Sequence, residues 1–119
     1  HAHQLLEPRH LFAPGVYMRR LLVRAGEVVV GKTHKHAHFL IVMSGKAWVI
    51  SEFGRELLEG GYVGISQPGV KRVVVGIDDT EFITIHHNPD NGEDLEAIEA
   101  AHIEPEVLGV EYETKGALQ

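Results

Sequence analysis

The stretch GEVVVGKTHKHAHFLIVMSG, residues 26–45, joins two apolar runs through three histidines at alternate positions. The runs VVV and HFLIVM have the composition of short buried strands, and the flanking glycines are typical of turns. His34, His36 and His38 carry the side chain that most often ligates transition metals at neutral pH. This stretch therefore predicts β-structure with a candidate metal site between two strands.

On both sides of this stretch, residues 15–88 continue as short apolar runs separated by turn signals. VYMRRLLVR (16–24) alternates in polarity and places Tyr17 and Arg19 on one strand face. HFLIVM and AWVIS, joined by SGK, are expected to form a hairpin, and YVGIS, RVVV and EFITIHH are expected to be further strands. About seven to nine strands without long helices between them predict an all-β antiparallel sandwich or barrel.

After Pro89 the composition changes, and one short helix is expected near residues 93–102. Asp90 or Asn91 is the expected N-cap. Leu95, Ile98 and His102 fall on one stripe that can face the barrel, although His102 itself is expected at the helix surface. The rest of the chain could be a short strand or a tail.

Composition narrows the function classes. The chain has 119 residues, no cysteine, nine histidines and a net charge of −6, so any metal site uses histidine, carboxylate or water. The acidic net charge argues against a nucleic-acid-binding surface. The sequence contains no apolar run of about 18 residues, so no membrane-spanning helix is predicted. We expect one domain over residues 1–119 and a cytoplasmic location, with a removed leader left open because the chain begins with His1.

The spacing of glycines and histidines resembles the cupin superfamily over residues 15–88. The first cupin motif is Gly, five residues, His-x-His, three or four residues, Glu, six residues, Gly; the second is Gly, five residues, Pro-x-Gly, two residues, His, three residues, Asn. The corresponding positions here are Gly26, Lys32, His34, His38 and Gly45, then Gly61, Gln67, Gly69, Arg72 and Gly76. The resemblance implies a small single-domain (monocupin) jelly-roll barrel, or double-stranded β-helix. RHLFAPGVYMR, GKTHKH and PGVKR are also similar to short uncharacterised phage and bacterial cupin-like proteins.

The ligand positions of the motif are only partly kept. Cupins usually bind metal through two histidines and a glutamate of the first motif and one histidine of the second. Lys32 and Arg72 replace two of these four ligands, and cations repel a metal ion, so an unmodified family site is excluded. His34 and His38 fall on the other two positions. On a regular strand they would stand about 13 Å apart, but the cupin motif bends the chain between these positions.

A third ligand is expected from the last strand, where His86 and His87 face opposite sides. Strand parity alone does not decide between them, and we predict His86. The expected cofactor is a divalent transition metal such as Zn, Ni, Fe or Mn, bound by His34, His38 and His86. Supporting or alternative ligands are His36, His87 and His10.

Cationic side chains near this site suggest a small anionic partner. Arg and Lys bind carboxylates and phosphates, so the candidate substrate-binding residues are Arg72, Lys32, Arg19 and Tyr17. The alternative is that Arg72 and Lys32 are simply solvated at the barrel rim.

Three functions follow from these expectations. The first is a metal-dependent lyase, isomerase or dioxygenase, whose catalytic residues the sequence does not name. The second is a non-catalytic module that binds a small ligand, and the third is an assembly protein with a vestigial pocket. A homodimer is expected in each case, because an open barrel leaves sheet edges to cover.

Overall fold

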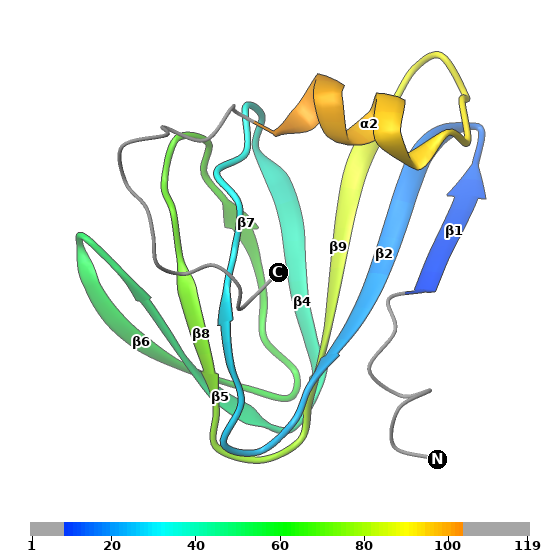
Figure 1. Ribbon diagram of the computed structural model, residues 1–119. Helices are drawn as coiled ribbons and strands as arrows, with labels where there is room; N and C mark the ends of the chain where they lie inside the picture. The colour runs from blue at the N-terminus through cyan, green and yellow to red at the C-terminus, as the bar shows by residue number, and fades with distance from the viewer. Residues whose placement is uncertain (1–8, 104–119) are drawn as a thin grey trace.

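Two antiparallel sheets face each other, converge at one end and spread apart toward the other (Figure 1). The computed structural model describes residues 9–103. The first sheet contains, in spatial order, β1 (Arg9–Ala13), β2 (Gly15–Val23), β9 (Thr80–Asn88), β4 (His38–Ser44) and β7 (Val63–Ser66). The second sheet contains β3 (Val28–Val30), β8 (Val73–Gly76), β5 (Lys46–Ser51) and β6 (Gly54–Glu59). The predicted all-β antiparallel fold is confirmed.

The hydrophobic core lies between the inner faces of the sheets. Alternate residues of each strand point inward, so a strand supplies a buried side chain at every second position. The buried cluster draws equally on the two layers and consists of Val23, Val42, Phe82, Ala47, Val49 and Leu58. This core fills the converging end and leaves the polar, histidine-bearing ends of the strands at the wide end.

The prediction of a hairpin at residues 44–46 is wrong. β4 pairs with β7 and β9, whereas β5 pairs with β6 and β8 in the other sheet, so the chain crosses between layers at Gly45. Gly45 has φ 94°, and a Cβ there would lie 2.2 Å from the Asp79 carbonyl oxygen. The close approach of this second loop leaves no room for a side chain.

The first sheet begins before residue 15. β1 pairs with β2 and places His10 opposite Arg19, so RHLFA is an edge strand of the sheet. His10 is therefore held in regular β-structure.

The expected short helix is present as α2 (Leu95–His102), and it lies across the ends of β4, β9 and β2 (Figure 1). Its N-cap is Asp94, whose side chain accepts a hydrogen bond from the Glu96 N–H. The prediction of Asp90 or Asn91 is therefore wrong, because Asn91 has φ 58° and its side chain instead accepts from the Gly15 N–H at 2.6 Å. No helix within residues 9–103 has the length and apolarity to cross a bilayer. The tail expected after α2 lies outside the described residues.

Candidate metal centre

Three imidazole rings converge inside the wide end of the barrel. His34 precedes β4, His38 begins it, and His86 lies on the neighbouring β9. Each ring offers one nitrogen, and these three nitrogens all lie within 4.8 Å of one another. In a tetrahedral site with bonds of about 2.0–2.1 Å the nitrogens stand about 3.4 Å apart, so small side-chain rotations complete the geometry.

The bend predicted from the cupin motif is what brings His34 and His38 together. Residues 34–37 leave the regular strand conformation, and the ring centroids of His34 and His38 lie 4.4 Å apart. The centroid of His38 is also 4.6 Å from that of His86. Two ligand positions from the bent segment thus meet a third from the adjacent strand.

Burial keeps these imidazoles neutral. It lowers the pKa of His86 to about 3, with His38 and His34 adding to the effect, and it lowers the pKa of His34 to about 4. The pKa of His38 is lowered too, again mainly by burial. Neutral imidazole is the form that ligates a metal, so no proton has to be displaced at neutral pH.

One atom of the triad lacks a partner. The Nδ1 atom of His38 is buried and has no hydrogen bond among the described residues, which is costly for a polar atom. A metal ion in the triad would be a natural partner for such a nitrogen. The donor set and this atom together show that the residues present fit a divalent transition metal.

Neighbouring side chains hold His86 in position. Its Nε2 atom lies 2.9 Å from the Thr84 hydroxyl, and its ring stacks on Tyr17 at a centroid distance of 5.6 Å. The Tyr17 hydroxyl is in turn hydrogen-bonded to Nδ1 of His10 at 2.7 Å. Such outer contacts fix the orientation of a ligand ring.

The candidate cationic residues divide into two groups. Arg19 lowers the pKa of His34 and His86, and Arg72 lowers that of His38, so both guanidinium charges act on the triad. Lys32 instead forms an exposed ion pair with Glu99 on α2. The structure thus places two arginines near the inner triad, which is the cluster of His34, His38 and His86. The lysine side chain instead points toward the helix.

A second histidine triad lies beside the first. His36, His87 and His102 also bring one nitrogen each to within 4.8 Å of one another. His102 is 7% exposed, so its expected place at the helix surface is wrong. The sequence signal was its position four residues after Ile98, the other buried residue of α2.

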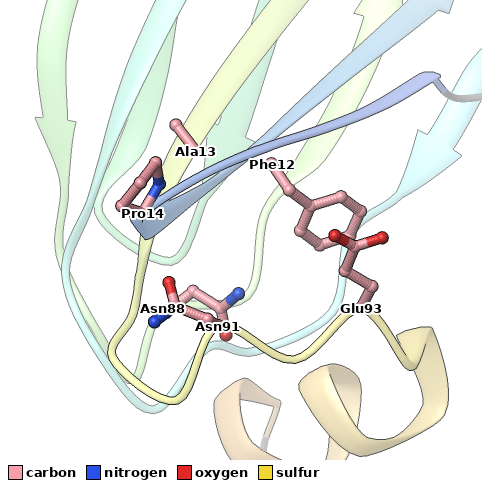
Figure 2. Close-up of a pocket in the computed structure, with 6 residues that line it drawn as sticks. All are labelled: Phe12, Ala13, Pro14, Asn88, Asn91 and Glu93. Atoms are coloured by element: carbon pink, nitrogen blue, oxygen red, sulfur yellow. The ribbon is translucent and has the colours of Figure 1, made fainter.

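A hollow of about 300 Å³ opens elsewhere, between the β1–β2 turn and the loop that leads to α2 (Figure 2). The side chains that line it are Phe12, Ala13, Pro14, Asn88, Asn91 and Glu93. None of the triad histidines borders it. Ring nitrogens converge in the triads and not here, so the candidate metal chemistry lies away from this hollow.

Solved structures resemble this arrangement of sheets. A cupin-2 domain protein from Shewanella frigidimarina aligns with a TM-score of 0.58 and 15% identity over 69% of this chain and 80% of its own. The chain has the cupin fold. A cupin-2 barrel protein from Salinispora arenicola aligns with a TM-score of 0.58 and 20% identity over 67% of this chain and 73% of its own.

One structural neighbour of this chain is an enzyme. Salicylate 1,2-dioxygenase from Pseudoaminobacter salicylatoxidans, solved with gentisate, aligns with a TM-score of 0.64 and 14% identity. The match covers 80% of this chain and 27% of the dioxygenase. No protein-family model matches the chain, and no curated protein matches it significantly. At these identities the comparisons show the fold alone.

Proposed function

We propose that this cupin is a metal-dependent enzyme of the lyase, isomerase or dioxygenase type that acts on a small anionic substrate. The observation that carries the proposal is the convergence of one nitrogen from each of His34, His38 and His86 within 4.8 Å. Three protein ligands leave coordination positions free, as catalytic metal sites require. When bound there, a divalent transition metal supplies Lewis-acid or dioxygen chemistry.

The chain's own residues supply the rest of the site. Arg19 and Arg72 place positive charge beside the triad, which suits a substrate carboxylate. Burial raises the pKa of Tyr17, so its hydroxyl stays protonated and can donate a hydrogen bond. His10, whose pKa burial lowers, stays neutral and holds that hydroxyl in place.

The dioxygenase neighbour gives the proposal a starting set of substrates. Salicylate and gentisate, named with that enzyme, are both aromatic carboxylates and carry the single negative charge that two arginines would attract. Small aromatic and aliphatic carboxylates are therefore the first compounds to test.

The first experiment measures bound metal in the purified protein by plasma mass spectrometry. We expect the wild type to hold Zn, Ni, Fe or Mn at the inner triad, and the His34→Ala and His38→Ala variants each to lose that ion. A wild type that holds no metal and takes none up overturns the proposal, as does retention of the full metal content by both variants.

The second experiment tests turnover. Protein loaded with Fe(II) is mixed with each carboxylate while oxygen uptake is followed by electrode and product formation by NMR. We expect turnover that requires metal and drops at least tenfold in Arg72→Gln, measured as kcat/KM. A protein that binds metal and a carboxylate but turns over none of them is the non-catalytic module considered as the alternative.

A further inference from the structure

The second triad has the donor set of a metal site. The ring of His87 lies 4.8 Å from that of His36 and 4.8 Å from that of His102, measured between centroids. The rings meet edge to face, at interplanar angles of 78° and 76°. Three nitrogens within 4.8 Å match the spacing found in the inner triad.

None of these ligands is shared with the inner triad. His86 and His87 are neighbours on β9, and successive strand residues point to opposite faces of a sheet. Accordingly His86 is buried while His87 is exposed. His36 is exposed as well, so this second triad opens to solvent whereas the inner one lies in the barrel.

Two of the three segments that carry these ligands are already held together by other contacts. The backbone N–H of Lys35 donates to the His102 carbonyl at 2.6 Å, and its ammonium donates to the Ala100 carbonyl at 3.1 Å. His34 and Ile103 form an isolated antiparallel bridge. The segment that carries His36 and the end of α2 therefore hold a fixed relation, which pre-organises the triad.

His102 is the ligand with the most restricted ring. It is buried at the last position of α2, and its ring meets the rings of His36 and His87 edge to face. The two exposed rings need only small rotations to meet it.

We propose that His36, His87 and His102 form a second site for a divalent transition metal such as Zn²⁺, separate from the inner triad, and that the ion fastens the end of α2 to β9. Three imidazoles and open positions toward water suit borderline ions such as Zn²⁺, Ni²⁺ and Cu²⁺. The role of the ion here is structural, since it bridges a helix, a strand and the loop between β3 and β4.

The test is equilibrium dialysis of the full chain against Zn²⁺ at pH 7.5, followed by metal analysis. All proteins carry His1→Ala and His3→Ala, so that these two histidines outside the described residues bind no zinc. We expect two ions per chain in this background. His36→Ala and His87→Ala, which alter exposed side chains, should each bind one.

The two triads can fail independently. Loss of zinc on His34→Ala but full retention on both His36→Ala and His87→Ala overturns the second site and leaves the proposed function standing. Loss on His36→Ala but not on His34→Ala supports the second site and overturns the inner one. Combining His34→Ala with His36→Ala should leave no bound zinc, and any ion that remains counts against the assignment of both sites.

A second measurement tests whether the ion holds the end of α2 against β9. Zinc should slow amide hydrogen exchange in residues 95–102 of the His34→Ala variant, where only the second triad is complete. The same addition should leave exchange unchanged when His87→Ala is added. Equal protection in both proteins would overturn the structural role, because it would not depend on this triad.

Discussion

At the scale of single residues, the buried histidines couple folding to pH. The pKa values of His34 and His86 lie at about 4 and about 3 in the folded chain, below the ordinary value of 6.5. Below about pH 6.5 the unfolded chain therefore binds more protons than the folded chain. The free energy of unfolding is unaffected by these groups above that pH and decreases as the pH falls toward 4. We expect the melting temperature of the metal-free protein, measured by calorimetry in chelator, to fall from pH 7.5 to pH 5.

The His86→Gln variant is the comparison for this effect. Glutamine cannot be protonated in this range, so the melting temperature of the variant should change less between pH 7.5 and pH 5 than that of the wild type. An equal slope in both proteins would show that other groups control the acid sensitivity.

A substitution at Gly45 tests the point where the chain crosses between the two sheets. An alanine there would combine φ 94° with a Cβ that meets the Asp79 carbonyl oxygen and Thr80. We expect Gly45→Ala to lower the free energy of unfolding by about 2 to 4 kcal/mol, measured by urea denaturation.

Gly61→Ala is the matched control, because Gly61 has φ 99° but nothing within 4 Å of the added Cβ. It should cost only the strain of the left-handed conformation, about 1 to 2 kcal/mol. Equal losses in the two variants would contradict the steric argument for Gly45.

At the scale of elements, the sequence predicted what local pattern and spacing determine. Alternation and turn residues located the strands, and the motif frame located the bend between His34 and His38. The pairing of β4 was not predictable in this way, because SGK has the composition of a hairpin turn while the close contact of Gly45 with Asp79 comes from a loop distant in sequence. The convergence of His34, His38 and His86 is a structural finding, and metal binding by them stays a prediction.

The second triad was not predicted from the sequence, for a related reason. His36 and His87 lie next to residues that the sequence predicted as metal ligands. His102 reaches them only because α2 docks across the strand ends. Helix periodicity indicates which stripe is buried and gives no information on what that stripe covers. A site shared by a helix and a sheet therefore depends on packing that local pattern does not contain.

The cap of α2 offers a test at this scale. The Asp94 side chain accepts the Glu96 N–H at 3.1 Å, and loss of an N-cap costs about 0.5 to 2 kcal/mol. We expect Asp94→Ala to speed amide exchange in residues 95–102 several-fold, measured by mass spectrometry. Asp94→Ser should restore the protection, and Asp90→Ala should have no effect. Faster exchange in Asp90→Ala instead would return the cap to the position predicted from the sequence.

At the scale of the whole molecule, β7 is an edge strand whose outer face continues that of β4. Phe39 pairs with Ile65 across these strands, and Ile41 pairs with Val63. Ile65 is 57% exposed and Phe39 is 52% exposed, so an apolar face adjoins a strand edge that no other strand within residues 9–103 pairs with. Both features favour association with a second copy of the chain, which would extend the sheet and cover the face.

We expect a homodimer that buries more than about 1,000 Å² through this edge. Ile65→Glu should shift the molar mass measured by light scattering toward the monomer, because it places a charge in the apolar face while disturbing no core contact. Phe53→Glu is the matched control, since Phe53 is 77% exposed in the β5–β6 turn, away from this face, and the variant should remain dimeric. A wild type that stays monomeric at high concentration would contradict the dimer, and dissociation by Phe53→Glu but not by Ile65→Glu would move the interface to the other sheet.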